Sequence, residues 1–377
     1  MLIAIPAETD AGEPRVAATP DTVKRMQALG ANVVVEAGAG RHAGIPDSEF
    51  AAAGAEIASD AKSTLREADV VLKVRRPAKA ELANYKPGAL LIGTLDPYGN
   101  ETALAELAAA RVSAFSMELL PRITRAQGMD VLSSQANLAG YRAVIDAAAV
   151  FGRAMPMMMT AAGTVPAAKV FVMGAGVAGL QAIATARRLG AIVTATDVRP
   201  AAREQVDSLG AKFIAVEDDE FEQAETAGGY AKEMSKEYQA KQAALVAAHI
   251  AKQDIVITTA LIPGRPAPKL VTKSMVESMK PGSVLVDLAV ERGGNVELAK
   301  PGEVVDIKGV KVVGYLNVPG RLAATASSLY AKNLFAFLEL LVDKEKKLNV
   351  PWDDEIVKAI LLTRDGAVVH PNFQKKA

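Results

Sequence analysis

Short apolar runs alternate with stretches of helical period along most of the chain, a pattern typical of βα units and parallel sheets. In the first 120 residues, the apolar runs predict strands at 2–6, 32–38, 69–74, 89–94 and 112–118. Helical patterns cover 19–30, 101–110 and a short stretch near 48–53. In the first helix, Thr19 is suited to the N-cap, Pro20 to the first helical position and Gly30 to the stop. These residues predict a complete α/β domain.

A second α/β series follows a long helical pattern at 133–153. Its apolar runs predict strands at 169–174, 191–197, 212–216, 254–260, 283–289 and 310–315, and another long helical pattern covers 323–342. A chain of 377 residues exceeds the length over which one hydrophobic core keeps growing, so two domains are expected. We therefore predict an α/β fold of two Rossmann-like, doubly wound parallel-sheet domains, joined by the two long helices, with a cleft between them. The first domain would comprise residues 1–131 and 323–377, and the second residues 132–322.

Composition and charge exclude several classes of function. Lysine plus arginine equals aspartate plus glutamate, 43 each, and no long basic run appears, so a nucleic-acid partner is not expected. The chain has no cysteine and only 3 scattered histidines, which excludes thiolate chemistry and gives no basis for a metal site. Since no run of roughly 18 apolar residues is uninterrupted, the chain by itself is not expected to cross a membrane.

The strongest chemical signal is "KVFVMGAGVAGLQAIATARRLGAIVTATDVR", residues 169–199. A β-branched strand leads into Gly174-x-Gly176-x-x-Gly179, then a helix, then a second strand that ends at Asp197. Gly174 allows the tight turn, Gly176 lets a pyrophosphate approach the backbone, and Gly179 lets the helix lie close to the strand. The helix N-terminus offers free N–H groups and a partial positive charge to the phosphates. This order of elements predicts a dinucleotide site rather than a glycine-rich turn of some other α/β fold.

Asp197 also bears on the choice of cofactor. A carboxylate at the end of the second strand binds the ribose hydroxyls of NAD and repels the 2′-phosphate of NADP, whereas Arg199 could attract that phosphate. Because the acid comes first and lies directly at the strand end, we predict NAD(H) rather than NADP(H) as the cofactor of this chain.

Further motifs extend along the chain: "RVAATP" (15–20), "MMMTAAGTVP" (157–166), "ETAGGYAKEM" (225–234), "TTALIPGRPAPKLVT" (258–272), "MKPGSVLVDLAVERGGN" (279–295) and "NVPGR" (317–321). Together with the nucleotide motif, they resemble the NAD(H)-binding domain I, or alpha-1 subunit, of proton-translocating NAD(P) transhydrogenase. The chain is similar also to alanine dehydrogenase, which shares the fold. The resemblance covers essentially the whole chain.

This resemblance implies a homodimer that is peripheral at the cytoplasmic, inner face of the bacterial inner membrane. It implies a B-side-specific (Si–Re) transhydrogenase, in which hydride passes from NADH on this chain to NADP⁺ on a separate domain III subunit. A membrane-spanning domain II subunit would couple the reaction to proton translocation. NAD(H) would bind here and NADP(H) on the partner.

The resemblance also assigns roles to "PRITRAQGMDVLSSQ", residues 121–135, which we call the nicotinamide loop. The polar groups around the dihydronicotinamide match Arg122, Gln127, Asp130 and Ser133, and neighbouring contacts match Ile123 and Thr124. The loop has no histidine, lysine or cysteine. Hydride transfer between two nicotinamides moves no proton to or from a substrate, so it needs no general acid or base. The site need only bring two rings together and exclude water.

Further family contacts fall on the second domain. The pyrophosphate turn matches Ala175, Gly176 and Val177, the adenosine end matches Asp197, Val198 and Arg199, and other NAD contacts match Gly229, Gln242 and Leu261. Tyr230 matches the tyrosine of a mobile loop that closes over bound nucleotide. The sequence agrees with such a flap, expected at about 217–240, because the polar interval 217–245 is long for a plain connection.

Simpler structural interpretations exist for several of these residues. Arg122 and Asp130 could form an ordinary loop salt bridge, and Ser133 could be the N-cap of a helix that begins at 134. Tyr230 could be an exposed loop aromatic. The methionine run 157–159 is more typical of core filling than of a cofactor contact.

Two other functions compete with transhydrogenation. Alanine dehydrogenase needs a proton acceptor, and that family uses a lysine, a histidine and an aspartate where this chain has Arg75, Asp96 and Glu291. An arginine remains cationic and is a poor base. Arg15, which matches that family's arginine for the substrate carboxylate, is retained. The third candidate is a non-catalytic NAD-binding module that reports on redox state.

Overall fold

The computed structural model describes residues 1–222, 234–262 and 264–374. The chain forms two compact units: unit 1 comprises Met1–Gln135 and Pro319–Ala377, and unit 2 comprises Ala136–Val318. The chain passes between the units at 135/136 and 318/319, a few residues from the boundaries at 131/132 and 322/323 that the sequence predicted. Helix α6 (Val131–Val150) contains the first crossing, whereas helix α12 (Ala323–Leu340) belongs to unit 1. Among the described residues, no helix has the length and apolar character needed to cross a membrane.

Unit 1 is built on a twisted sheet in which the first strands are parallel. These are β1 (Leu2–Ile5), β2 (Asn32–Glu36), β3 (Glu56–Ala58), β4 (Val70–Arg75), β5 (Leu90–Thr94) and β6 (Ser113–Ser116). Strands β16 (Leu361–Arg364) and β17 (Ala367–Val368) extend the sheet in antiparallel fashion. The order is β17-β16-β6-β5-β4-β1-β2-β3, so the chain winds outward from β1 on one side and from β4 on the other. This is a doubly wound arrangement.

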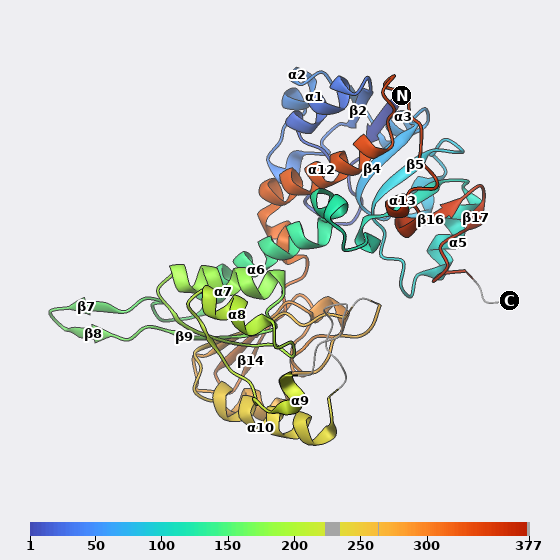
Figure 1. Cartoon of the computed structure of the whole chain (residues 1–377). Coiled ribbons are helices and arrows are strands. Elements are labelled where there is room, and N and C mark those ends of the chain that lie inside the picture. Colours follow the sequence, from blue (N-terminus) through green and yellow to red (C-terminus); the bar gives the residue numbers. More distant parts are fainter. Residues whose placement is uncertain (223–233, 263, 375–377) are drawn as a thin grey trace. The chain divides into compact units, whose positions relative to one another are not determined.

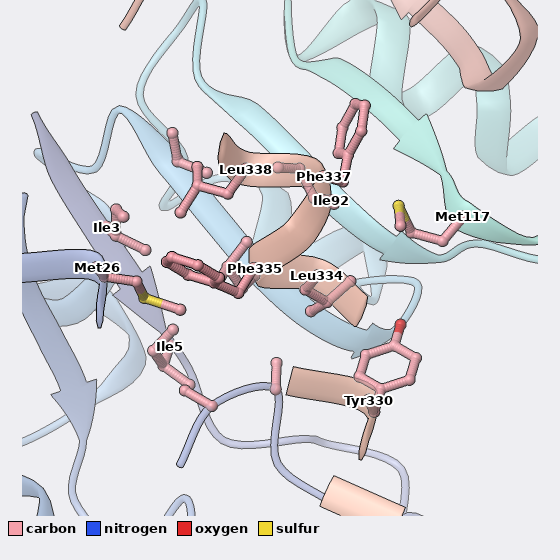
Figure 2. Close-up of a cluster of buried hydrophobic side chains, with 14 of the residues drawn as sticks. Ile3, Ile5, Met26, Ile92, Met117, Tyr330, Leu334, Phe335, Phe337 and Leu338 are labelled. Atoms are coloured by element: carbon pink, nitrogen blue, oxygen red, sulfur yellow. The ribbon is translucent and has the colours of Figure 1, made fainter. Parts of the chain in front are cut away.

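Helices cover the sheet of unit 1 because its strands alternate between two apolar faces. Ile3 and Ile5 belong to one buried cluster and Ala4, between them, to another. Besides α12, the helices are α1 (Pro20–Ala28), α2 (Asp47–Ala52), α3 (Ala61–Leu65), α4 (Lys79–Leu82), α5 (Glu101–Ala109) and α13 (Glu355–Ile360). Figure 2 shows Leu334, Phe335 and Leu338 of α12 gathered with side chains of the first strands. The expected N-cap Thr19 and Pro20 stand at the start of α1.

Unit 2 repeats this plan around the nucleotide motif. Its strands are β9 (Lys169–Met173), β10 (Ile192–Thr196), β11 (Lys212–Phe213), β12 (Ile255–Thr258), β13 (Val284–Asp287), β14 (Val304–Ile307) and β15 (Val310–Val313). The order is β11-β10-β9-β12-β13-β15-β14, with only β14 antiparallel within the described sheet. The winding direction changes between β9 and β12, and ligands of such sheets bind at the carboxyl ends of the strands at that point.

Two sets of helices enclose the sheet of unit 2. One buried cluster joins the sheet to α6, α7 (Val177–Arg188) and α8 (Ala202–Ser208), and the cluster on the other face joins it to α10 (Lys236–Ile250) and α11 (Lys273–Ser278). Figure 1 shows α7 and α10 on opposite sides of the strands. The short helix α9 (Asp219–Glu222) precedes residues 223–233, which lie outside the described part of the chain.

The methionine run 157–159 does not fill the core, so that expectation was wrong. Met157, Met158 and Met159 are 63%, 43% and 79% exposed. They lie at and before the hairpin of β7 (Met158–Thr160) and β8 (Gly163–Val165), which projects from unit 2 in Figure 1. The hairpin forms a separate two-stranded sheet, and a ribbon that pairs only with itself has no sheet partner to cover its apolar side chains.

Candidate functional site

The glycines of the nucleotide motif occupy three different environments at the carboxyl end of β9. Gly174 has a φ of 105°, and a Cβ added to it would lie 2.5 Å from Thr259 Oγ1. A Cβ on Gly179 would lie 1.7 Å from the backbone oxygen of Gly174, so α7 crosses the turn too closely for any side chain. A Cβ on Gly176 would meet nothing within 4 Å. The fold itself therefore demands Gly174 and Gly179, whereas Gly176 borders open space.

The start of α7 is suited to an anion. Gly176 stands at the N-cap without a side-chain cap, so no side chain of the cap residue takes the first N–H groups of this 12-residue helix. Val177, the first helical residue, is 42% exposed. Backbone N–H groups and the helix dipole thus converge beside the open space at Gly176, which is the arrangement that binds a pyrophosphate.

Asp197 is locked against this turn. One of its carboxylate oxygens accepts from the backbone N–H of Ala175 at 2.7 Å and the other from that of Arg199 at 2.9 Å. The Arg199 guanidinium pairs with the same carboxylate, with Nε–Oδ1 at 2.9 Å and Nη2–Oδ2 at 3.1 Å, and also donates to the Ala175 carbonyl at 3.3 Å. The charge of Arg199 is therefore balanced by Asp197, which weakens its attraction for a 2′-phosphate.

The remaining residues expected at the nucleotide fall into three groups: two exposed apolar residues, one glutamine that is hydrogen-bonded within unit 2, and a segment outside the described residues. Val198 and Leu261 are 52% and 51% exposed beyond the ends of β10 and β12 and offer apolar surface. Gln242 instead connects α10 to the end of β10 and to the segment after β11. Its Nε2 donates to Thr196 Oγ1 at 3.1 Å, and its Oε1 accepts from the Val216 backbone N–H at 2.9 Å. Gly229 and Tyr230, with the central part of the expected mobile loop (223–233), lie outside the described residues.

The nicotinamide loop is anchored on one side and open on the other. It follows the 3-10 turn η2 (Met117–Leu119) and includes η3 (Thr124–Met129), where Ala126 and Met129 are buried in unit 1. Asn333 of α12 donates to the Gly128 carbonyl at 2.8 Å. In contrast, Arg122, Thr124 and Gln127 are exposed, and Ile123 is partly buried against the core. The loop is therefore attached to unit 1 through its buried side chains and presents polar side chains at the surface.

A charged pair adds a second anchor for this loop. Arg125 donates two bonds to the Asp354 carboxylate at the start of α13, at 2.7 and 3.0 Å. The Arg125 guanidinium lowers the pKa of the Asp354 carboxyl. Because solvent reaches both groups, this ion pair contributes little to the free energy of folding. Its main effect is to hold the loop next to the start of α13.

The end of the loop differs from its sequence-based interpretation. Helix α6 begins at Val131 rather than at 134, and Asp130 takes the capping role assigned to Ser133. The Asp130 carboxylate accepts from the Ser133 N–H at 2.9 Å and from its hydroxyl at 2.5 Å. Aspartate is at least as good an N-cap as serine, so the helix starts at the earlier residue. The Ser133 hydroxyl would have to exchange this bond to donate to a carboxamide.

The sequence patterns did not indicate the role of Glu13. Its carboxylate pairs with Arg15 and Arg75, the two arginines that bear on alanine dehydrogenation. Arg15 donates through Nε and Nη2 to the Glu13 carboxylate, both at 2.6 Å, and through Nη1 to Gln135 Oε1 at 2.7 Å. Arg75 Nε also donates to Glu13, at 2.8 Å. The Glu13-x-Arg15 spacing was the available signal. Arg75 is thus a paired cation, which does not act as the proton acceptor that amine oxidation requires.

Comparisons with known proteins agree with this geometry. The family models "Alanine dehydrogenase/PNT, N-terminal domain" and "Alanine dehydrogenase/PNT, C-terminal domain" match residues 4–139 and 143–371. The chain is 58% identical, over 98% of both sequences, to an NAD(P) transhydrogenase alpha subunit of Rhodospirillum rubrum. The solved transhydrogenase structure from Sinorhizobium meliloti is 62% identical, with 98% of this chain and 100% of that chain covered and a TM-score of 0.91. An L-alanine dehydrogenase structure is 26% identical, with 100% and 98% covered and a TM-score of 0.84. The chain therefore belongs to the alanine dehydrogenase/PNT family, among the NAD(P) transhydrogenase alpha subunits.

Proposed function

We propose that this chain is the NAD(H)-binding, hydride-donating subunit of a proton-translocating transhydrogenase. NADH bound here would pass a hydride directly to NADP⁺ held on a separate domain III subunit, with B-side specificity. A membrane-spanning domain II subunit would couple the transfer to proton translocation, and this chain would be peripheral at the inner face of the bacterial inner membrane. The chain would be catalytically complete only with these partners.

One observation carries this proposal: the nicotinamide loop is anchored through Gly128 and Arg125, yet it exposes Arg122 and Gln127 at its surface. A buried redox site would enclose such groups, whereas transfer to a second protein requires that the ring edge be reachable. The bound cofactor supplies the hydride. The chain's own residues hold the ring, through Arg122, Gln127 and Ser133, and restrict its orientation, which is the main contribution a protein can make to a reaction without proton transfer.

Unit 2 by itself supplies groups that fit the other parts of NAD. Gly176 and the free N–H groups of α7 fit the pyrophosphate, and Asp197 fits the adenosine ribose. Val198 and Leu261 offer apolar surface for the adenine. The ion pair between Asp197 and Arg199 supports a preference for NADH over NADPH.

We also propose that the chain acts as a homodimer through the exposed hairpin. Three consecutive methionines, each at least 43% exposed, lie on or beside this projecting ribbon. Large apolar side chains exposed close together are typical of protein contacts, and a second copy of this chain carries the same three residues.

The triple variant Met157→Ser, Met158→Ser, Met159→Ser should weaken the dimer at least about tenfold, because each buried methionine side chain contributes about 1.5–3 kcal/mol. Analytical ultracentrifugation across a concentration series measures this effect. Val304→Ser, at an apolar residue 40% exposed on another edge of unit 2, is the matched control. A triple variant that dimerises as strongly as the wild type would exclude the hairpin as the contact.

Transhydrogenation can be tested directly with the purified chain, NADH, an oxidised NADP analogue and a domain III protein. We expect reduction of the analogue only when domain III is present, at a rate that saturates with domain III. NADH oxidation that instead depends on pyruvate and ammonia would support alanine dehydrogenation. NADH binding without either reaction would support the non-catalytic module.

A further inference from the structure

We propose that Glu118 is a positioning residue for hydride transfer, because it joins the loop after β5 to the start of the nicotinamide loop. This inference rests on the proposed function and adds to it a residue that the sequence motifs do not single out. Glu118 lies in η2, three positions before Pro121 and outside the nicotinamide loop itself. Its influence on the nicotinamide would be indirect, through the backbone that it holds.

The Glu118 carboxylate accepts hydrogen bonds from residues at the ends of two strands, β5 and β6. It accepts from the backbone N–H of Leu95 at 3.1 Å, from that of Asp96 at 2.5 Å, and from the Ser116 hydroxyl at 2.6 Å. Strands β5 and β6 are parallel neighbours, with Gly93 opposite Ser116, so the two segments leave the sheet side by side. One side chain thereby fixes the segment that follows β5 to the segment that follows β6.

The backbone that Glu118 holds is strained. Asp96 has a φ of 47°, in the left-handed region, which residues with a side chain adopt uncommonly. From the other side, Arg76 Nη1 donates to the carbonyls of Leu95 and Asp96 at 2.8 and 2.9 Å. Strained residues persist only where surrounding bonds over-determine them, and they cluster at functional sites. Here an anion and a cation hold the N–H and C=O groups of one turn.

The chemistry of the site explains why a carboxylate is needed. Burial raises the pKa of Glu118, while the Ser116 hydroxyl and the backbone N–H groups favour its charged form. An amide in its place would present an NH₂ group to one of these three donors, and that donor would lose its acceptor. The strained turn and η2 would then relax, and the first residues of the nicotinamide loop would move with η2. A displacement of about 1 Å in a reacting geometry can reduce a rate about 100-fold.

Glu118→Gln should therefore lower the rate of hydride transfer about 10- to 100-fold. The NADH dissociation constant should change less than about twofold, since the nucleotide motif lies in unit 2 and its residues make no bond to Glu118 among those described. Single-turnover transfer to an NADP analogue, with saturating domain III, measures the rate, and NADH titration measures the affinity. If Glu118 served only to stabilise the fold, its substitution would not lower the rate of hydride transfer while leaving the NADH affinity unchanged.

Two variants complete the test. Ser116→Ala removes one donor and leaves the carboxylate, so it should lower the rate in the same direction, about three- to tenfold, and it decides the question if Glu118→Gln does not fold. Glu106→Gln, which removes an acid of α5 that pairs with Lys79, is the matched control and should transfer hydride at the wild-type rate. Folded variants with wild-type rates, or with rate and NADH affinity reduced together, would overturn the inference. Failure of the wild-type chain to transfer hydride would instead reject the proposed function.

Discussion

Gly176→Ala should lower the affinity for NADH at least about tenfold, equivalent to about 1.4 kcal/mol, while the chain remains folded. The backbone of Gly176 has φ −75° and ψ −170°, which alanine adopts without strain, and the added Cβ would meet no protein atom within 4 Å. The cost to stability is limited to the poorer N-cap, about 1 kcal/mol or less. The methyl group would, however, occupy the space through which a pyrophosphate approaches the α7 N–H groups. Calorimetric titration with NADH and a thermal melt measure the two quantities.

Gly179→Ala, in the same motif, should give the opposite profile. Its Cβ would lie 1.7 Å from a backbone oxygen, so α7 must move away from the strand. We expect a loss of about 3 kcal/mol or more in the stability of unit 2, which the gain of about 1 kcal/mol in helix propensity does not offset. If Gly176→Ala instead bound NADH normally, the pyrophosphate would have to lie elsewhere.

Asp197→Asn should produce the second large effect, a loss of discrimination between NADH and NADPH. The substitution preserves size but removes the charge that, in the proposed function, binds the ribose hydroxyls and repels a 2′-phosphate. Loss of a hydrogen bond to a charged group costs about 1.5–3 kcal/mol, so NADH affinity should fall about 10- to 100-fold. At the same time, the Arg199 guanidinium loses the partner that it now contacts at 2.9 Å and becomes able to bind the phosphate of NADPH. The ratio of the two dissociation constants, measured by titration, should therefore shift by more than either affinity.

Two further variants isolate the cause. Adding Arg199→Ala to Asp197→Asn should abolish the gain in NADPH binding, because the guanidinium that the first substitution releases is then removed. Asp207→Asn, at an exposed residue of α8, removes the same charge without touching the turn and should leave the cofactor preference unchanged. A wild-type preference in Asp197→Asn would show that another residue selects the cofactor.

The local pattern of the chain predicted most of the fold. Strands at β1, β2, β4 and β5 and helices α1 and α5 start within one residue of their expected positions. These elements are long or strongly patterned, and capping residues such as Thr19 mark their ends. The short elements β3, α3 and α4 were not predicted, because three to five residues contain too little periodicity to identify. The separate hairpin β7–β8 was missed for the same reason.

The sequence by itself determined the nucleotide turn, because Gly174, Gly176, Gly179 and Asp197 act within one continuous strand–helix–strand segment. Only the tertiary structure decided which of these glycines the fold requires and which borders open space, since the atoms they approach include Thr259, far along the chain. It also decided that Asp197 holds Arg199, that Glu13 pairs with both Arg15 and Arg75, and that Glu118 joins two strand ends. The sequence shows that Asp197, Glu13 and Glu118 each carry a carboxylate, but it does not show which groups each carboxylate will contact. Its partners depend on which strands become neighbours, and the packing of the whole sheet decides that.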